Sequence, residues 1–193
     1  MKTTFPKVLK FVLIFVLIFV PLFVTIALSP WIVFLGGLIF APSPGQPEFV
    51  YGEFPFSLTY ELNGEIIEIN DVIICEYNGV VLRDDRGKMR QWNEKLKSGN
   101  EKIILLDLSD SSETDELGRE ILEVFFSYGR AEYYMGETQT SSNPPTTDSI
   151  AYLYITSEGT IGGSGYRPEE AYEKFGIRLI SWECAPPREN SFK

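Results

Sequence analysis

The sequence contains no histidine and only two cysteines among its 193 residues. Without an imidazole, the chain cannot form a Ser-His-Asp or Cys-His catalytic centre, use histidine as a general acid or base, or bind zinc through histidine. Two cysteines are too few for a four-cysteine zinc site. The sequence therefore predicts no metal ligand, no cofactor and no catalytic residue, and it does not single out a binding residue.

Charged side chains are missing from residues 11–40, a long and almost wholly apolar run. About 20 apolar residues are enough for a helix to cross the hydrocarbon core of a bilayer. The run is longer than that, so it predicts one transmembrane helix that is tilted or kinked. Pro21 and Pro30 are candidate kinks, because proline lacks the N–H that a mid-helix residue donates. A hairpin-like break at Ser29-Pro30 is the alternative.

The lysines predict how the chain is oriented in a cell membrane. Lys2, Lys7 and Lys10 precede the apolar run, whereas residues 42–47 carry no lysine or arginine. Positive charge collects on the cytoplasmic side, so residues 1–10 are expected in the cytoplasm and the rest outside, as in a single-pass protein. A cleaved signal peptide, cut after Thr25-Ile26-Ala27, is the competing interpretation. The apolar run continues more than ten residues beyond that site, which favours an uncleaved anchor.

The remainder of the chain has the length of one domain. Residues 41–47 (APSPGQP) predict a short, stiff linker, and residues 48–193 form the domain. That domain holds all 27 acidic residues but only 14 of the 17 basic ones, so its formal net charge is −13. Such an excess argues against binding nucleic acid or anionic lipid, both of which need clustered Lys and Arg. It fits a solvated domain or one that meets basic partners.

Both cysteines, Cys75 and Cys184, fall in strand-like segments of this domain. A disulfide between them is chemically permitted outside the cytoplasm, and two separate buried thiols are equally compatible with the sequence. The geometry of the fold decides between the two states.

The clearest local structure is a β-hairpin. Apolar and polar residues alternate over Phe56–Leu62, and Asn63-Gly64 supplies the positive-φ residues of a type I′ turn. This turn predicts that Leu58 lies opposite Ile69. It likewise places Tyr60 opposite Ile67, and Thr59 opposite Glu68.

The remaining segments predict an α+β fold built on a mostly antiparallel sheet of six or seven strands with two short helices. A second hairpin is expected around Asn78-Gly79. Met89, Trp92 and Leu96 have the spacing of a short helix closed by Gly99. The second helix is expected from Pro168 to Gly176. Further strands are predicted at residues 102–108, 120–126, 150–156 and 177–184, and residues 159–165 are expected to be a flexible turn. The segment 120–126 also fits a helix, through Leu117, Ile121 and Val124, but its content of Val and aromatic residues favours a strand.

Three clusters of polar residues or glycines invite a functional interpretation, and each has a simpler one. The run Gly159–Gly165 lacks a Walker lysine and the Rossmann spacing, so it predicts a surface turn rather than a phosphate cradle. The basic residues near 90 are expected on a solvated helix face, with an anion-docking site as the alternative; they are Arg86, Lys88, Arg90, Lys95 and Lys97. The acidic cluster lacks the order of a calcium loop and predicts a solvated loop; it comprises Asp107, Asp110, Glu113, Asp115 and Glu116.

Three strings resemble a group of small, uncharacterised, membrane-tethered proteins of Gram-positive bacteria. They are Phe54–Glu65 (FPFSLTYELNGE), Ala131–Gly136 (AEYYMG) and Leu179–Pro187 (LISWECAPP). The resemblance implies a cell-membrane protein with an external domain. No activity comes with the group, so it assigns no site residue.

The sequence favours a single-pass membrane protein that displays an acidic external domain and acts as a binding, accessory or sensor module. Its partners are then the lipid bilayer, through residues 11–40, and a candidate second membrane or envelope protein. The alternative is a hydrolase without histidine that uses two carboxylates at the cell envelope. A third hypothesis is a structural or protective partner of another membrane protein. A cleft with paired carboxylates favours the hydrolase, whereas an exposed apolar patch favours a binding or structural role.

Overall fold

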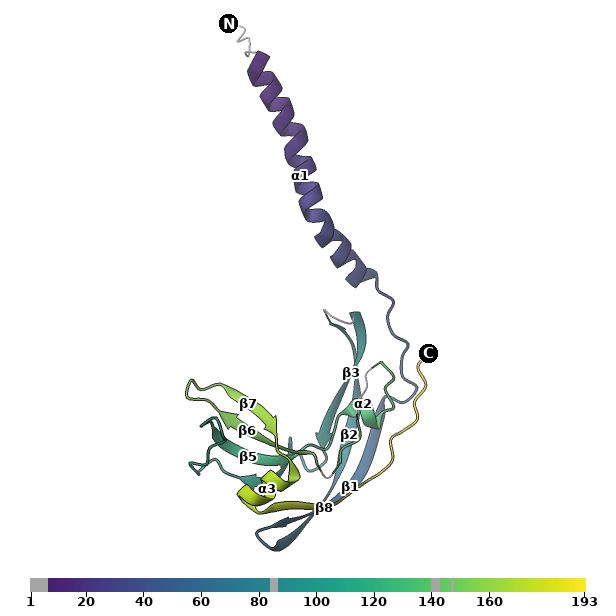
Figure 1. Cartoon of the computed structure of the whole chain (residues 1–193). Coiled ribbons are helices and arrows are strands. Elements are labelled where there is room, and N and C mark those ends of the chain that lie inside the picture. The colour runs from purple at the N-terminus through teal and green to yellow at the C-terminus, as the bar shows by residue number, and fades with distance from the viewer. Residues whose placement is uncertain (1–6, 84–86, 140–142, 147) are drawn as a thin grey trace. The chain divides into compact units, whose positions relative to one another are not determined.

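The computed structural model describes residues 7–83, 87–139, 143–146 and 148–193. The chain divides into two compact units. One comprises the residues up to 44 together with 81–89, and the other comprises residues 45–80 and 90–193. Figure 1 shows the helices and strands of both units.

The first unit contains the helix α1 (Lys7–Phe40), which continues through both prolines. Its 20-residue stretch Val12–Trp31 is long and apolar enough to cross a membrane, although a signal sequence has the same character. Pro30 cannot donate to the carbonyl of Ile26 four residues earlier, and the Ser29 hydroxyl donates to that carbonyl instead, at 2.9 Å. The helix therefore does not break at Ser29-Pro30, and the hairpin-like alternative is wrong.

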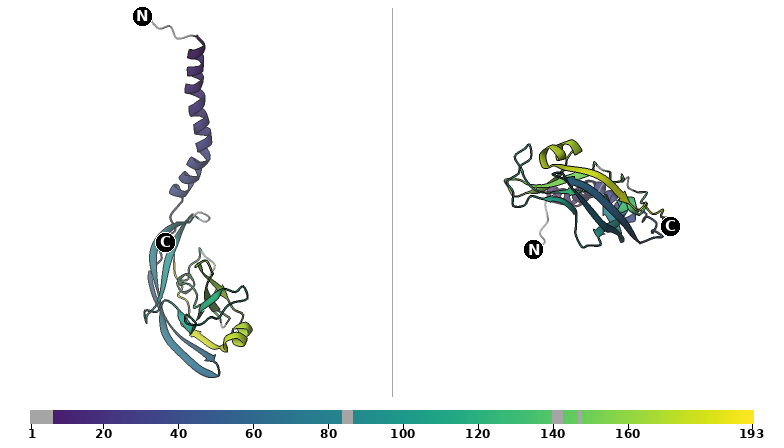
Figure 2. Two further views of the ribbon diagram at one scale, coloured as in Figure 1. Left: turned by 90° about the vertical axis from the view of Figure 1, so that its left-hand side faces the viewer. Right: turned by 90° about the horizontal axis from the view of Figure 1, so that it is seen from below.

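Eight strands form two four-stranded sheets in the described part of the chain, in agreement with the predicted α+β class. The first sheet has the order β3-β2-β1-β8, with β3 (Gly87–Leu96), β2 (Glu65–Arg83), β1 (Tyr51–Leu62) and β8 (Ile177–Cys184). The second has the order β4-β5-β6-β7, with β4 (Ile103–Asp107), β5 (Glu120–Phe126), β6 (Ile150–Ile155) and β7 (Ile161–Gly165). Two short helices, α2 (Ala131–Tyr134) and α3 (Pro168–Phe175), complete the fold (Figures 1 and 2).

The β1–β2 hairpin has the predicted register. Leu58 pairs with Ile69, Tyr60 with Ile67, and the turn closes through Leu62 and Glu65. Asn63 and Gly64 both have positive φ, at 53° and 89°, as a type I′ turn requires. The turn residues and the alternation act over a few residues only, so this part of the fold follows from local sequence.

The second predicted hairpin is wrong, because β2 runs without a turn through Asn78-Gly79. Gly79 has a positive φ of 83°, but Asn78 is not among the residues with positive φ. A type I′ turn needs that conformation at both central residues. Pairing with β1 carries β2 as far as Glu76 opposite Tyr51, and Tyr77 then donates to the carbonyl of Val50 at 2.8 Å.

The predicted helix at Met89, Trp92 and Leu96 is also wrong, because these residues belong to β3. Trp92 and Leu96 are buried on one face of this strand, and the same face also carries the buried Arg90 and the exposed Glu94. These two polar residues interrupt the period-two pattern of apolar residues, and the apolar residues of the segment happen to have helical spacing.

The later elements agree with the sequence more closely. The strands β4, β5, β6 and β8 and the helix α3 lie where they are predicted, and Gly176 ends α3 with φ of 66°. The glycine-rich segment differs, because only its start forms a turn and Ile161–Gly165 is the strand β7. Gly162 lies under the ring of Tyr154, and a Cβ there would approach that ring to 2.5 Å. Glycine therefore permits the close contact between β6 and β7.

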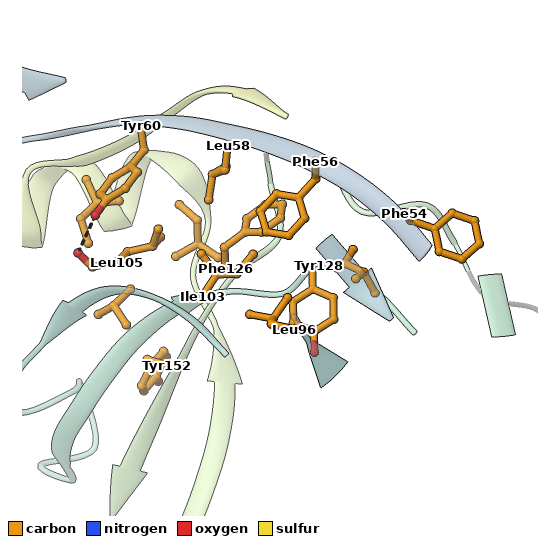
Figure 3. Packing of buried hydrophobic residues seen from close by; sticks show 14 of the residues in the cluster. Phe54, Phe56, Leu58, Tyr60, Leu96, Ile103, Leu105, Phe126, Tyr128 and Tyr152 are labelled. Carbon is orange, nitrogen blue, oxygen red and sulfur yellow. Dashed lines mark hydrogen bonds between the residues drawn. The ribbon is translucent and has the colours of Figure 1, made fainter. Parts of the chain in front are cut away.

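The core lies between the two sheets. Phe56, Leu58 and Tyr60 extend from one face of β1 toward residues of the second sheet, including Phe126 (Figure 3). The Tyr60 hydroxyl donates to the carbonyl of Leu105 at 3.3 Å, so the two sheets are also joined by a hydrogen bond.

A buried ion pair holds together four segments that are distant in sequence. Arg90 on β3 donates to both carboxylate oxygens of Glu137, at 2.6 and 2.7 Å, and both side chains are almost fully buried. Trp92 donates to Glu137 at 3.0 Å, and Arg90 also donates to the carbonyl of Gly45. The guanidinium lies 3.9 Å from the ring centre of Phe192. Residues at the end of the expected linker are therefore bound to β3 through Arg90 and to the C-terminal segment through the backbone of Gln46 and Lys193.

Neither cysteine forms a disulfide. Cys75 is fully buried in β2, and burial raises the pKa of its thiol to about 12. Burial also raises the pKa of Cys184. Both thiols are protonated at neutral pH and pack as small apolar groups.

Phe126→Ala tests whether the interface between the sheets stabilises the domain. Phe126 is fully buried and lies 4.7 Å from the ring of Trp182 on the opposite sheet. Its truncation removes apolar contacts and leaves a cavity, so we expect unfolding to become easier by about 3–5 kcal/mol. Denaturant unfolding followed by far-ultraviolet circular dichroism measures the change. Ile104→Ala is the matched control, because Ile104 is 45 % exposed on the same sheet and its loss should cost less than about 1 kcal/mol. Equal effects of the two substitutions would contradict this packing.

Candidate functional site

A pocket of about 520 Å³ lies beside α3 in the second unit. The loop before β5, the strand β6, the end of β7 and the helix α3 surround it, and Figures 1 and 2 show these elements side by side. Its volume lies in the range of small-molecule sites. The lining residues are Asp115, Glu116, Leu117, Arg119, Tyr152, Gly165, Tyr166, Glu170, Glu173 and Lys174.

Asp115 fixes the loop that forms one wall of this pocket. One carboxylate oxygen accepts the backbone N–H groups of Leu117 and Arg119, at 2.9 and 3.0 Å. The other accepts the Arg119 guanidinium at 2.6 Å and the Tyr152 hydroxyl at 3.3 Å. Burial alone would raise the pKa of Asp115, but these donors outweigh it and lower the pKa to about 2. Asp115 is therefore ionised and fully engaged, and its role here is structural.

Two tyrosine rings, Tyr152 and Tyr166, form a second part of the pocket lining. Tyr152 and Tyr166 are stacked with their ring centres 4.3 Å apart, and Tyr166 meets Phe175 of α3 edge to face at 5.6 Å. The Tyr166 hydroxyl is buried and has no hydrogen-bond partner among the described residues. Burial, together with the nearby negative groups, raises its pKa. A buried phenol without a partner is unusual, because leaving such a group unpaired costs about 1–3 kcal/mol.

The basic groups of the pocket are already bound. Arg119 pairs with Asp115, and its guanidinium lies 3.6 Å from the ring centre of Tyr154. Lys174 donates to the backbone carbonyl of Thr114. Two exposed carboxylates at the rim, Glu116 and Glu173, have no ion-pair or hydrogen-bond partner in the described ranges. The carbonyl of Thr114 does not neutralise Lys174, but the two unpaired carboxylates outnumber this lysine, so the balance of unpaired charge in the lining is negative.

The structure disperses the acidic cluster that the sequence groups together. Asp115 and Glu116 line the pocket, whereas Asp107 binds the backbone and hydroxyl of Ser109 at 3.0 and 2.7 Å. Among the residues that the structure describes, no group of three or more acidic or cysteine side chains could hold a metal ion. The cluster is thus neither a calcium loop nor one continuous site.

The expected basic group near residue 90 does not form an anion-docking site on a helix. Arg90 is buried against Glu137, and Arg86 lies outside the described residues. Lys95 pairs with Glu76 at 3.0 Å, and Lys97 pairs with Glu53 at 3.3 Å. The first pair joins the neighbouring strands β3 and β2, the second joins the residue after β3 to β1, and both offset the charge of their lysines.

Two carboxylates meet at a second place, where β3 passes α2. Glu94 accepts the backbone N–H of Ala131 at 3.2 Å, and Glu132 accepts the Arg130 guanidinium at 3.0 Å. Burial raises the pKa of Glu94, and the charge of Glu132 raises it further. The second oxygen of Glu132 is buried and has no partner among the described residues. Neither side chain lines the pocket beside α3.

Sequence reasoning missed most of the pocket. Arg119, Tyr152 and Tyr166 are not in a motif, and they come together only when β5, β6 and α3 pack. One local signal exists, because an aspartate followed by Leu117-Gly118-Arg119 is typical of a turn in which the carboxylate caps backbone N–H groups. That signal predicts the loop but not the tyrosine wall.

The fold and this site define an acidic α+β domain with a tyrosine-lined pocket, in a chain that also holds one long apolar helix. No known protein family, curated protein or solved structure matches the chain. The resemblance to Gram-positive membrane-tethered proteins therefore stays a prediction, and the geometry alone carries the functional argument.

Asp115→Asn tests whether this carboxylate holds the pocket loop. The lowered pKa means that Asp115 stabilises the fold above its unfolded pKa of about 3.9, and that this contribution is lost as the pH falls toward 2. We expect the variant to be less stable by about 2 kcal/mol at pH 7 and to approach the wild type near pH 2. Urea unfolding in detergent at pH 7, 4 and 2.5 measures this difference. Asp110→Asn is the control, because Asp110 is exposed and should change stability little at any pH. A difference that does not depend on pH would contradict the role of the charge.

Proposed function

We propose that this chain is a single-pass membrane protein whose acidic domain lies outside the cell membrane and works as a binding, accessory or sensor module. The observation that carries the proposal is the pocket beside α3, in which a tyrosine wall, a buried unpaired hydroxyl and two free carboxylates converge. Convergent polar groups on a partly apolar cavity are the general mark of a binding site.

The placement in the membrane rests on the helix α1 and on its flanks. Val12–Trp31 is long and apolar enough to span a bilayer. Lys7 and Lys10 precede the stretch and no basic residue follows it before the domain, which favours a cytoplasmic N-terminus. If the helix were instead a cleaved signal sequence, the same domain would be released with the same pocket.

Binding is favoured over catalysis because the buried acid of the pocket is already engaged. Asp115 accepts hydrogen bonds from three residues, and Glu170 accepts the Arg167 guanidinium. A general acid or base needs a carboxylate that is free to exchange a proton with a substrate. The unpaired carboxylates, Glu116 and Glu173, are exposed to solvent. Such groups are better suited to attract a cationic ligand than to act as a general acid or base.

A hydrolase that uses two carboxylates is the second candidate. The specific observation in its favour is the pair of Glu94 and Glu132, in which one carboxyl has a raised pKa beside a second, buried carboxylate. Glycoside hydrolases separate acid and base in this way. The candidate ranks second, because these side chains lie away from the pocket that could hold a substrate.

Site-specific photo-cross-linking in native membranes tests the proposed binding function. Leu117 lies on the pocket rim with 76 % of its surface exposed, so a benzoylphenylalanine at this position can reach a bound molecule. We expect a reproducible adduct on irradiation of the full-length protein, identified by mass spectrometry of the intact chain and of its peptides.

Ile180 on β8 provides the matched position. It is 47 % exposed and does not line the pocket. The adduct should form from position 117 and not from position 180. The same products from both positions, or no product from either, would contradict a binding role for the pocket.

A further inference from the structure

We infer that the pocket beside α3 recognises an organic cation, an alkylammonium or guanidinium group on an apolar stem. This inference rests on the proposed binding function and names the chemical class of its ligand. The cation could be carried by a free amine or by a Lys or Arg side chain of a partner, and the recognition chemistry is the same for both.

The first argument is the balance of available charge. The basic groups at the pocket, Arg119 and Lys174, are bound to Asp115 and to a backbone carbonyl. Glu116, on the loop before β5, and Glu173, on α3, are exposed and have no ion-pair or hydrogen-bond partner in the described part of the chain. Thr114 supplies a neutral carbonyl, so Lys174 keeps its charge, but the two unpaired carboxylates outnumber it, and this balance favours a cation over an anion.

The second argument is the aromatic wall. The face of a tyrosine ring attracts a cation through its quadrupole, and stacked rings also offer apolar surface to a hydrocarbon stem. Tyr152 and Tyr166 supply such rings, and the lining of the pocket combines them with Leu117 and Gly165. Arg119, 3.6 Å from the ring centre of Tyr154, already shows a guanidinium against an aromatic ring at this site.

The third argument is the unpaired hydroxyl of Tyr166. A phenol oxygen can accept a hydrogen bond from an N–H donor, and this hydroxyl has no such partner among the described residues. Tyr166 is part of the pocket lining, so we expect a bound ammonium to donate to this oxygen. The ligand would then satisfy a polar group that the protein itself leaves unsatisfied.

The wider charge of the domain supports the same class of ligand. Residues 48–193 carry 27 acidic and 14 basic side chains. A negative field of this kind raises the local concentration of cations and speeds their association, with a strong dependence on ionic strength.

Nuclear magnetic resonance of the full-length protein in neutral detergent tests the inference, with ring resonances of ¹³C-labelled tyrosine as the signal. The probes are butylammonium, the methylamide of N-acetyl-lysine, its Nε-acetylated neutral form, and butyrate. We expect the two cations to shift the resonances of Tyr152 and Tyr166 with millimolar affinity, as is usual for ligands of this size. The neutral form and butyrate should leave them unchanged. Shifts with the lysine derivative alone would support the same inference with a polypeptide as the source.

Paired variants separate the local carboxylates from the overall charge. Glu116→Gln with Glu173→Gln should weaken cation binding about fivefold to tenfold, since the two nearest free charges are removed. Glu183→Gln with Glu189→Gln makes the same change in net charge away from the pocket and should leave the affinity within about twofold.

The cation inference and the proposed binding function can fail independently, and different results would contradict each of them. Binding of butyrate, or equal binding of the neutral and charged lysine derivatives, would overturn the cation inference and leave the binding function standing. Absence of any shift would also overturn the inference, and the position-117 cross-link then decides separately whether the pocket binds another kind of molecule.

Discussion

The structure of the domain depends on one face of β1. Phe54, Phe56, Leu58 and Tyr60 are all buried along that face. Phe54 packs against Tyr134 of α2 at 5.1 Å between ring centres, while Tyr60 reaches the second sheet through its hydroxyl. The strand is central in its sheet, with β2 on one side and β8 on the other. The buried face of β1 therefore connects the first sheet both to the second sheet and to the helix α2.

The pocket forms where the second sheet, the helix α3 and the loop before β5 pack together. The strand β6 brings Tyr152 beside Tyr166, which lies just before the start of α3. The two tyrosines and the glutamates of α3, Glu170 and Glu173, therefore line the same pocket. Asp115 anchors the facing loop to the same tyrosine. Its carboxylate binds backbone N–H groups of that loop as well as a side chain, so the loop has a defined shape before any ligand arrives. Such preorganisation lowers the entropy cost of binding.

The sequence predicts the parts of this fold that short-range chemistry determines. Asn63-Gly64 and the alternation beside it predict the first hairpin with its register, and Pro168 with Gly176 predicts α3. The strand β3 was not predictable, because the polar residues Arg90 and Glu94 interrupt its apolar face and only the fold supplies their partners. The pocket was not predictable either. Its decisive contacts join Asp115 to Tyr152 and Lys174 to Thr114, across 37 and 60 positions of the chain.

The central claim is that the apolar helix holds this acidic domain outside the cell membrane. It is tested most directly by treating intact cells with a broad-specificity protease and detecting an epitope at the C-terminus, with permeabilised cells treated in parallel. The account predicts that the epitope is lost, or shortened by cleavage in residues 41–47, already in intact cells. Protection in intact cells with loss only after permeabilisation would place the domain in the cytoplasm and contradict the account.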